Sequence, residues 1–547
     1  MLKSEICYSR TTLYSSDYFE VVRCEWKKGD ASPLHDHRWS QCSTFIEHGV
    51  FANRTVSGLN DSQKIFEPGQ TIHVPPGAQH EMSCLSEAGS TLHVYTPRIS
   101  DKPAPTVFSH PNADTLKKEL SLGLDSNGIS WAELIQSLAQ LREKSVNTHS
   151  VYFMNQLFSG VLPEVLASEN ILAETRTTMA TFEASPALSL VELELMKKLS
   201  ELIGWHPDDA DGVMVPGGSA ANFMALHCAR IRKKPELKKT GLFQSQPMRI
   251  FCSSEAHYSM QKACVALGFG TDSLVHISVD QQTGAMNTDE LKKSIALCIE
   301  QSCLPLMVCA TAGTTVKGAF DPIEDIAEIC AEHQIWLHVD GAWGGPVIFS
   351  ERHRALLKGL LKADSMTFDA HKLFGAGLTS SVFIAQDGRI LLQANDVSGG
   401  EYLFHNGSEF IDRGRLSWQC GRRADALSFW TIWKSYGTNG LGQFVDRQMD
   451  LQSELTAWIR QQPRLRLIAE PEYLNICVQV LPPAQNPESD TKKWSEYVRN
   501  SLKQKNQCLV NYSTECDGTT FLRLILAHPQ LTLANLQQIL QWALAIT

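Results

Sequence analysis

Several common sequence features are missing from this chain of 547 residues. None of its 15 cysteines belongs to a C-x-x-C pair, which argues against a zinc ribbon, and their odd number argues against a secreted disulfide framework. No segment reaches the roughly 18 uninterrupted apolar residues of a membrane span, and the first thirty residues hold no signal-sequence run. The formal net charge of -10 leaves no basic excess for nucleic acid. These absences predict a cytoplasmic protein that acts on small molecules, with no nucleic-acid or membrane partner.

Length and texture predict at least two domains, because single cores stop growing near about 250–300 residues. Residues 1–97 contain short β-like segments, at 19–26, 70–74 and 90–95, separated by Gly, Pro and Asn. This pattern is typical of a small barrel or a jelly roll built from two sheets. Residues 98–112 are rich in Pro and Ser and predict an extended linker.

From residue 113 to residue 547 the predicted elements change to helices alternating with strands. A helix is predicted over residues 187–203, and the predicted strands are 248–252, 304–309, 335–339, 365–368 and 381–385. Such alternation predicts a mainly parallel sheet covered by helices on both faces.

Two closely spaced histidines, His35 and His37, mark the segment SPLHDHRWSQC. On a strand, side chains at i and i+2 point to the same face, as two ligands of one metal must. The surrounding frame is Gly29, His35-x-His37 and Gly49, followed by Gly69 and Pro75-x-Gly77-x-x-His80. It resembles the two motifs of the cupin superfamily, jelly-roll barrels with a metal site, over residues 1–97. The resemblance implies His35, His37 and His80 as metal ligands.

Cys42 indicates which group of cupins this region resembles. Most cupins carry a glutamate ligand four or five residues after the second histidine, where this chain has Cys42. An all-histidine triad beside a cysteine resembles the thiol dioxygenases, in particular the cysteine dioxygenases, which are non-haem Fe(II) enzymes. Three neutral imidazoles leave Fe(II) its full charge for an anionic substrate thiolate.

Two further segments match the same family. The tripeptide YSR at residues 8–10 resembles its substrate-carboxylate arginine and neighbouring tyrosine. Thr91-x-His93-x-Tyr95 resembles its Ser-x-His-x-Tyr triplet, in which the tyrosine can form a thioether with the cysteine that matches Cys42. The resemblance implies catalytic roles for Cys42, His93 and Tyr95, and substrate binding by Tyr8 and Arg10.

A second constellation surrounds Asp369-Ala370-His371-Lys372. Lys372 follows a predicted strand, at the strand end where α/β sheets bind ligands, and Asp340 closes an earlier strand. A lysine that forms a Schiff base and an aspartate that pairs with a pyridinium nitrogen are the minimal equipment for pyridoxal phosphate. The segment PGGSAAN, which includes Gly218 and Ser219, leads into a helix whose first amides can hold a phosphate.

These motifs resemble the group II amino-acid decarboxylases, closest to the cysteine sulfinate and glutamate decarboxylases. NQLFSG at 155–160, QCGRR at 419–423 and FLR at 521–523 match as well. The resemblance implies the aspartate aminotransferase-like fold (fold type I of pyridoxal phosphate enzymes) over residues 113–547. It further implies an N-terminal helical segment, a large cofactor domain, a small C-terminal domain from about residue 440, and a homodimer.

The family's functional residues carry over onto matching positions of this sequence. For the cofactor, the resemblance implies contacts from Gly218, Ser219, His257, Thr314, Asp340, Ala342, His371 and Lys372. For the substrate, it implies Gln156, Phe158 and Arg523, the last holding the acidic group that survives the reaction. Lys372, His257 and Tyr402 would be catalytic, with Tyr402 returning a proton to the substrate carbon. Asp369-Ala370 replaces the Asn-Pro of close relatives, and Gly341 replaces an alanine.

Phe158 favours a short acidic substrate, because cysteine sulfinate decarboxylases have Phe-Ser here and glutamate decarboxylases have smaller residues. One methylene discriminates by only about 10–200-fold, so side activities are expected. The two halves together predict oxidation of L-cysteine by O2 to cysteine sulfinate and its decarboxylation to hypotaurine, the precursor of taurine. Two alternatives stay open. One is an aspartate, glutamate or cysteate decarboxylase fused to a cupin for a different thiol, and the other has a cupin that only senses thiol or metal.

Overall fold

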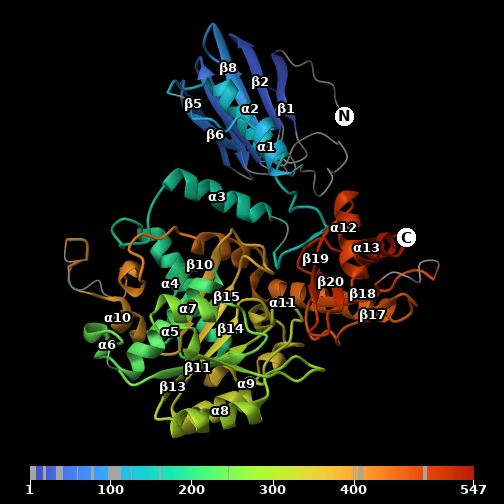
Figure 1. Ribbon diagram of the computed structural model, residues 1–547. Helices are drawn as coiled ribbons and strands as arrows, with labels where there is room; N and C mark the ends of the chain where they lie inside the picture. Colours follow the sequence, from blue (N-terminus) through green and yellow to red (C-terminus); the bar gives the residue numbers. More distant parts are fainter. Residues whose placement is uncertain are drawn as a thin grey trace. The chain divides into compact units, whose positions relative to one another are not determined.

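The computed structural model describes residues 8–15, 20–32, 41–57, 60–74, 79–96 and 112–547, except 125, 159, 161, 244, 398, 401, 405–410 and 485–489. The chain divides into two compact units, Met1–Asn147 and Thr148–Thr547 (Figure 1). Almost all of the predicted linker, residues 98–112, lies outside the described residues, so its boundaries stay a prediction.

The first unit contains two antiparallel sheets. One has the order β1 (Ser9–Ser15), β2 (Glu20–Lys27), β8 (Ala88–Thr96), β3 (Gln41–His48), β6 (Thr71–Val74). The other has the order β5 (Asn60–Phe66), β4 (Phe51–Ser57), β7 (Gln79–Cys84). The all-β character predicted for this region is confirmed.

Alternation along the strands decides which side chains enter the core of the first unit. Val22, Cys24 and Trp26 of β2 are at most 3% exposed and share the inner face of the larger sheet. On its outer face Phe45 contacts the ring of Trp131, at 6.0 Å between centroids. Trp131 begins α2 (Trp131–Glu143), which follows α1 (Ala113–Glu119).

The second unit is built on a seven-stranded sheet. Its order is β10 (Asp211–Pro216), β16 (Ser380–Ala385), β15 (Ser365–Asp369), β14 (Trp336–Gly341), β13 (Leu304–Thr311), β11 (Met248–Ser253), β12 (Leu274–Ile277). Strand β16 runs antiparallel to both of its neighbours, and the remaining pairs are parallel. The five strands predicted from the sequence lie within two residues of β11, β13, β14, β15 and β16.

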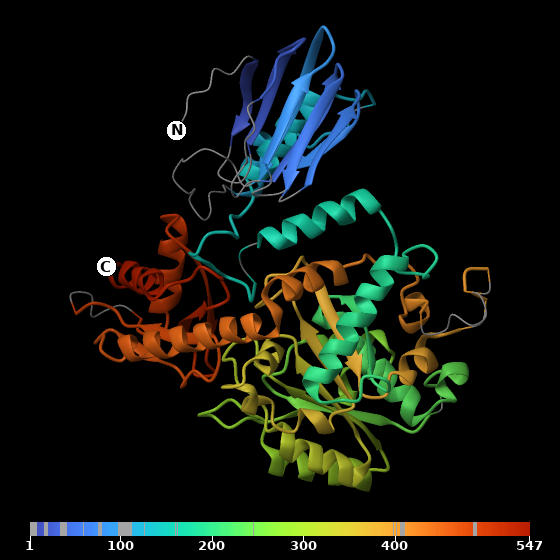
Figure 2. The ribbon, with the colours of Figure 1, turned by 180° about the vertical axis from the view of Figure 1, so that it is seen from behind.

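Both faces of this sheet are buried, as its nearly continuous apolar strands require. Ile250 and Cys252 of β11 belong to one core and Phe251 between them to the other. The first face is covered by α5 (Gly218–Lys233), α7 (Ser259–Ala266) and α10 (Arg389–Asn395). The second is covered by α4 (Pro186–Ile203), α8 (Thr288–Glu300), α9 (Ile323–His333) and α11 (Ala426–Ile459) (Figure 2).

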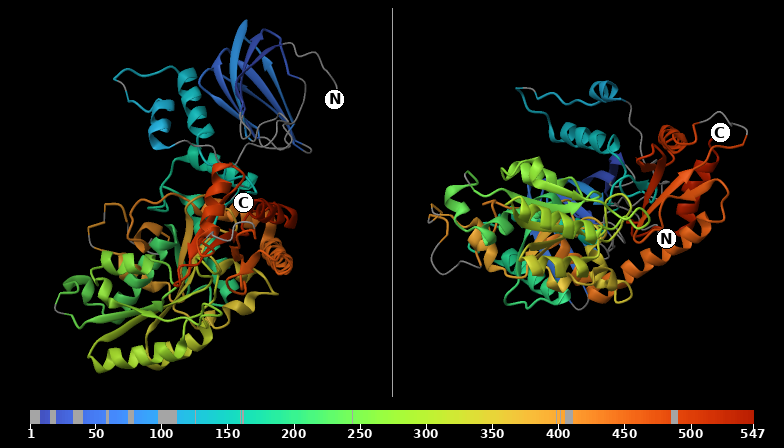
Figure 3. Two further views of the ribbon diagram at one scale, coloured as in Figure 1. Left: turned by 45° about the vertical axis from the view of Figure 1, so that its right-hand side comes forward. Right: turned by 60° about the horizontal axis from the view of Figure 1, so that its bottom comes forward.

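A smaller sheet follows, drawn mostly in orange to red (Figure 3). Its order is β17 (Leu465–Leu467), β18 (Asn475–Val480), β20 (Thr520–Ile525), β19 (Leu509–Thr514), β9 (Phe153–Met154). The remaining elements are α3 (Pro163–Thr175), α6 (Leu237–Thr240), α12 (Trp494–Gln504), α13 (Leu533–Leu544) and the 3-10 turns η1 (Thr271–Ser273), η2 (Gly345–Phe349), η3 (Arg354–Leu357), η4 (Leu360–Lys362) and η5 (Arg413–Leu416). Within the described part of the chain, no helix is long and apolar enough to cross a membrane.

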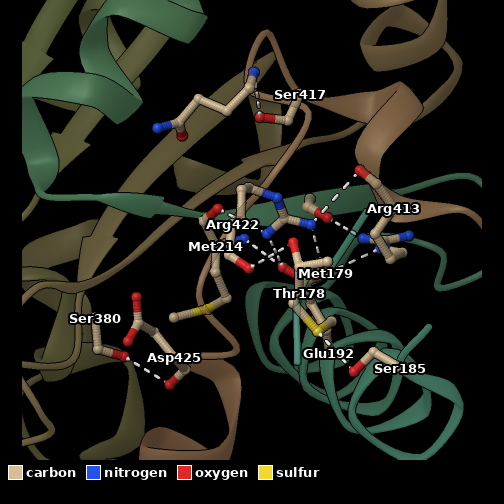
Figure 4. A network of polar contacts seen from close by, with 12 residues as sticks. Thr178, Met179, Ser185, Glu192, Met214, Ser380, Arg413, Ser417, Arg422 and Asp425 are labelled. Atoms are coloured by element: carbon tan, nitrogen blue, oxygen red, sulfur yellow. Dashed lines mark hydrogen bonds and ion pairs between the residues drawn. The ribbon is translucent and has the colours of Figure 1, made fainter. Parts of the chain in front are cut away.

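A buried group of charges fixes β10, the strand that leads toward the functional cavity (Figure 4). Arg422 donates to both carboxylate oxygens of Glu192, at 2.7 and 3.0 Å. Arg413 donates to Glu192 at 3.4 Å and to Asp211, the first residue of β10, at 2.8 Å. Burial alone would raise the pKa of Glu192, but the two guanidinium groups lower it to about 2. The QCGRR motif therefore has a structural role through Arg422.

Candidate active site

Three neighbouring parallel strands end at one cavity. Thr311 closes β13, Asp340 lies near the end of β14, and Asp369 closes β15. The cavity measures about 260 Å³. These three residues line it together with Gly217, Gly218, Ser219, Asn222, His257, Tyr258, Gly313, Thr315, Ala342, Trp343, His371 and Lys372. Ligands of parallel α/β sheets bind at this edge, where strand and helix ends present polar groups.

A turn containing two glycines forms one wall of the cavity. Gly217 has φ of 93°, which favours glycine, and Gly218 begins α5. A Cβ atom on Gly218 would lie 2.8 Å from an oxygen of Asp369 and 3.2 Å from the Cβ of Ala342. A side chain at position 218 would therefore displace the Asp369 carboxylate. The first amides of the 16-residue α5 point out of its N-terminus, an arrangement suited to a phosphate group.

Lys372 lies on the turn after β15, beside a carboxylate. Its Nζ is 3.0 Å from Oδ2 of Asp369, whose side chain is 1% exposed. The neighbouring His371 donates from Nδ1 to the main-chain oxygen of Ser380 at 3.1 Å, because a carbonyl can only accept. Burial lowers the pKa of His371. His371 is therefore a neutral hydrogen-bonding group at the cavity wall.

Asp340 is held by two N–H donors, one on each carboxylate oxygen. The side-chain amide of Asn222 donates to Oδ2 at 2.7 Å, and the main-chain N–H of Ala342 donates to Oδ1 at 3.1 Å. Asn222 is 1% exposed. The carboxylate thus has one fixed orientation at the cavity.

His257 forms another part of the lining. The main-chain N–H of Ser259 donates to its Nδ1 at 3.2 Å, so the proton of the neutral ring is on Nε2. Burial is the largest influence on the pKa of His257 and lowers it. A neutral, flat ring in this place is suited to stacking on an aromatic cofactor.

The residues around the cavity fit pyridoxal phosphate. Among the described residues, Thr311 Oγ1 and Asp369 Oδ1 are buried without a hydrogen-bond partner, as expected where a polar ligand completes the site. Lys372 would bond to the cofactor, Asp340 would pair with the ring nitrogen, and the glycine turn with Ser219 would hold the phosphate.

Several predicted residues lie elsewhere. Thr314 is buried and its hydroxyl accepts from the N–H of Ala319 at 3.0 Å, so Thr311 and Thr315 line the cavity in its place. Tyr402 is 82% exposed and is not part of the lining formed by the described residues. Phe158 contacts the ring of Phe153, at 6.0 Å between centroids, and Gln156 is exposed.

Arg523 lies on β20, close to the cavity rim. Its guanidinium donates to the main-chain oxygen of Thr315 at 2.8 Å and to that of Asn155 at 3.1 Å. Asn475 was not found from the sequence. It accepts from Trp343 Nε1 at 2.6 Å and donates to the oxygen of Thr315 at 3.0 Å. An asparagine opening the apolar strand NICVQV was the one available signal.

A larger cavity, of about 530 Å³, lies at the amino-terminal ends of β13 and β14. Its charged lining is already paired, with Arg232 2.6 Å from Asp387 and Lys362 3.5 Å from Glu328. The smaller cavity is therefore the better candidate, because chemically reactive groups converge only on that one of the two.

In the first unit, strand register brings together three of the residues predicted from sequence. Cys42 lies opposite Tyr95, and Thr44 lies opposite His93. Because directly opposed residues share a face of a sheet, Thr44 and His93 lie on one face. Tyr8 stacks on Trp26 of the same core, at 3.9 Å between ring centroids.

The side chains around His93 form a row that we call the Cys42 line. Trp26 donates to Thr91 Oγ1 at 2.8 Å, and Thr91 Oγ1 is 2.9 Å from His93 Nε2. His93 Nδ1 is 2.9 Å from Thr44 Oγ1, which is 3.4 Å from the sulfur of Cys42. Each of these five side chains is at most 5% exposed.

The predicted metal ligands are described only in part. His80 is 1% exposed, and its Nδ1 donates to the amide oxygen of Asn53 at 2.9 Å, so a metal would bind through Nε2. His35 and His37 lie outside the described residues. Within the described ranges, no three His, Cys, Asp or Glu side chains are placed to hold a metal ion. Arg10 is exposed and lies opposite Cys24.

Comparisons with known proteins agree on the part of the chain that contains the second unit. A family model described as the pyridoxal-dependent decarboxylase conserved domain matches residues 114–481. Cysteine sulfinic acid decarboxylase of Rattus norvegicus is 36% identical over 437 residues, covering 78% of this chain and 88% of that protein. Acidic amino acid decarboxylase GADL1 of Xenopus tropicalis is 35% identical over 437 residues, covering 78% and 85%. The crystal structure of mouse CSAD superposes with a TM-score of 0.76 at 34% identity, over 80% of this chain and 92% of that one.

Proposed function

Because the chain belongs to the pyridoxal-dependent decarboxylase family, we propose that its second unit removes the α-carboxylate of cysteine sulfinate as CO2 and releases hypotaurine. We further propose that the first unit forms cysteine sulfinate from L-cysteine and O2, so that two consecutive reactions share one cytoplasmic chain. The observation that carries the decarboxylation is the similarity to cysteine sulfinic acid decarboxylases over 78% of the chain. The oxidation is supported by the register of Cys42 opposite Tyr95 and of Thr44 opposite His93.

In the decarboxylase unit, pyridoxal phosphate supplies an electron sink for the pair of electrons left on the substrate carbon when CO2 departs. The chain's own residues would bind and orient the cofactor and the substrate. Asp340, fixed by Asn222 and Ala342, would keep a proton on the ring nitrogen. His257 would cover one ring face and exclude water. Tyr402, whose side chain is 82% exposed, would deliver a proton to the substrate carbon.

The substrate's sulfinate would bind at the rim. Arg523 is a cation whose guanidinium is fixed by two main-chain oxygens, and its Nε is buried without a partner in the described structure. A guanidinium suits an oxyanion. Phe158 would limit the length of the substrate.

In the first unit, Fe(II) would supply a centre at which O2 reacts with the cysteine sulfur. The chemistry of the proposed ligands His35, His37 and His80 fits this ion, and the contact with Asn53 fixes the ring of His80. Arg10 and Tyr8 would bind the carboxylate of the substrate cysteine.

A coupled assay tests both steps. L-cysteine is supplied to aerobic protein loaded with iron and pyridoxal phosphate, and cysteine sulfinate and hypotaurine are both quantified. Lys372→Ala should stop the sequence at cysteine sulfinate, and His80→Ala should abolish oxygen uptake but leave the decarboxylation of added cysteine sulfinate intact. Lys239→Ala and His48→Ala, both at exposed positions, serve as controls.

The assay also separates the alternatives. A sensing first unit would give no oxygen uptake with L-cysteine in the unaltered protein. A decarboxylase for another acid would show a higher kcat/KM for aspartate, glutamate or cysteate than for cysteine sulfinate. Either result would contradict the proposed pair of reactions.

A homodimer is part of the proposal. Helix α2 exposes Leu134, Leu138 and Leu141, which are spaced to share one helix face and are 36%, 49% and 40% exposed. An apolar stripe of this kind is suited to a second copy of the chain. Light scattering should give twice the monomer mass of 60.8 kDa.

A further inference from the structure

A row of buried polar side chains runs along the central sheet behind Asp340, and we call it the Asp340 line. Trp336 Nε1 donates to Ser365 Oγ at 2.8 Å, and Ser365 Oγ is 2.9 Å from His338 Nδ1. His338 Nε2 is 3.1 Å from Asn222 Oδ1. Asn222 donates in turn to Asp340 at 2.7 Å. None of the five is more than 7% exposed.

The donors and acceptors give this row one direction. An indole N–H can only donate, so Ser365 accepts from Trp336 and its own hydroxyl proton goes to His338 Nδ1. The proton of the neutral imidazole is then on Nε2 and is donated to Asn222 Oδ1. With its oxygen engaged, the Asn222 amide directs its two N–H groups to Asp340 and to Ser259, at 2.7 and 2.8 Å.

The opposite tautomer of His338 would leave groups unpaired. With the proton on Nδ1, the Ser365 hydroxyl would have no recorded acceptor among the described residues, and two lone pairs would face each other at 3.1 Å between His338 Nε2 and Asn222 Oδ1. Thr367 supports the first arrangement, because its hydroxyl donates to the same Asn222 oxygen at 2.7 Å. Leaving a buried polar group unpaired costs about 1–3 kcal/mol, which favours the first arrangement.

His338 stays neutral within this row. Burial lowers its pKa to about 4, against weaker opposite effects of Asp340 and the Ser365 main chain. Among the described residues, Asp340 is the one charged group that affects the pKa of His338.

We propose that Ser365 and His338 are positioning residues for the cofactor: they lock the Asn222 amide in the orientation that donates to Asp340, and so fix Asp340 toward the cofactor's ring nitrogen. This inference rests on the role of Asp340 in the proposed function. Neither Ser365 nor His338 lines the cavity, so they act through Asn222.

The tautomer provides a test that needs no cofactor. In cofactor-free protein labelled with 15N-histidine, the His338 signals, identified by their loss in His338→Gln, should show a proton on Nε2. Ser365→Ala should give a mixture of tautomers. A proton on Nδ1 in the unaltered protein would overturn the proposal, whatever happens to the variants.

Cofactor binding provides the second readout. Ser365→Ala should raise the Kd of pyridoxal phosphate about tenfold and alter the pH dependence of its visible absorbance. Ser200→Ala is the control, because Ser200 is also buried but its hydroxyl donates to the main-chain oxygen of Met196, away from the row, and its loss should change the Kd by less than about threefold. Equal Kd and spectra for Ser365→Ala and the unaltered protein would overturn the proposal.

Asp340→Ala separates failure of this inference from failure of the proposed function. If Asp340→Ala leaves the cofactor spectrum unchanged, the assignment of Asp340 itself is wrong. If it changes the spectrum but Ser365→Ala does not, only the role of the row is wrong.

Discussion

The two units solve the same problem of holding a buried histidine. In the Asp340 line and in the Cys42 line, an indole N–H donates to a hydroxyl, and the hydroxyl contacts an imidazole. In the Cys42 line, Thr91 accepts from Trp26 and lies 2.9 Å from His93 Nε2, and His93 Nδ1 lies 2.9 Å from Thr44 Oγ1. Each histidine therefore faces a hydroxyl that accepts from a tryptophan, which itself can only donate.

The two lines end differently. In the second unit an amide passes the direction on to the carboxylate of Asp340, which receives a second donor from Ala342. In the first unit a rotatable hydroxyl, that of Thr44, faces the sulfur of Cys42 at 3.4 Å. An amide is planar and cannot reverse its donors without turning over, whereas a hydroxyl can rotate. The amide therefore fixes its donor on Asp340, whereas the Thr44 hydroxyl can reorient beside Cys42.

The largest expected effect comes from removing the side chain at the end of each line, Asp340 or Cys42. Asp340→Ala should lower kcat/KM for cysteine sulfinate on the order of 10³-fold, about 4 kcal/mol, because the ring nitrogen loses its anionic partner. Oxygen uptake with L-cysteine should not change. Cys42→Ala should show the reverse pattern, with slower oxygen uptake and unchanged decarboxylation. A loss of both activities in either variant would mean that the two units do not work independently.

The next largest effect should come from removing a buried charge in the second unit. Glu192→Gln leaves two buried guanidinium groups without their shared carboxylate and should lower the free energy of unfolding of the second unit by about 3 kcal/mol, measured by urea denaturation. Because its pKa is lowered to about 2, the Glu192 contribution is complete above about pH 5 and is lost as the pH falls through 2.

A partly exposed pair in the first unit is the matched control for Glu192. Glu47→Gln breaks the contact with Arg23, whose side chain is 34% exposed, and should cost only about 0–1 kcal/mol. Similar losses of unfolding free energy in Glu192→Gln and Glu47→Gln would contradict the expectation that burial decides the size of the effect.

The neutral state of His338 should appear in the pH dependence of stability. Its pKa is about 4 in the folded protein, against about 6.5 when unfolded, so between these values only the unfolded chain binds the proton. Stability should therefore fall as the pH drops below 6.5, by about 2 kcal/mol at pH 5. His338→Gln should flatten that slope, and exposed His206→Gln should not. An unchanged slope in His338→Gln would assign the effect to other groups.

The smallest effect is expected at the hydroxyl link of the Cys42 line. Thr44→Val should lower the stability of the first unit by about 1 kcal/mol, because the buried hydrogen bond between Thr44 Oγ1 and His93 Nδ1 is lost. Thr44→Ser should keep the stability of the unaltered protein, because serine keeps the hydroxyl oxygen. Equal behaviour of the valine and serine variants would show that the methyl packing matters and the hydrogen bond does not.

The sequence predicted most of the large elements and the residue types of the cofactor site. Parallel strands reveal themselves as apolar runs, and Asp340 and Lys372 stand out because charges rarely close such runs. The partners of Asp340 could not be predicted, since Asn222, Ser365 and His338 come together only when α5 and β15 pack on β14.

The spacing of residues did not predict which hydroxyls near Thr314 line the cavity, and the reason is a different one. The segment TAGTT offers three hydroxyls within five residues, and the turn at Gly313 decides which of them enter the cavity. Thr314 faces Ala319 as a result, and Thr311 and Thr315 face the cavity. A sequence motif identifies such a loop but not the rotation of each side chain within it.

The strand order of the second unit has a consequence for protein synthesis. Within the described residues, edge strand β10 pairs only with β16, and β10 ends at Pro216 whereas β16 ends at Ala385. At about 5–20 residues per second, roughly ten to thirty seconds separate their emergence from the ribosome. During that time β10 has no neighbouring strand to pair with. The strands of the first unit, all before residue 97, can pair while the second unit is still being translated.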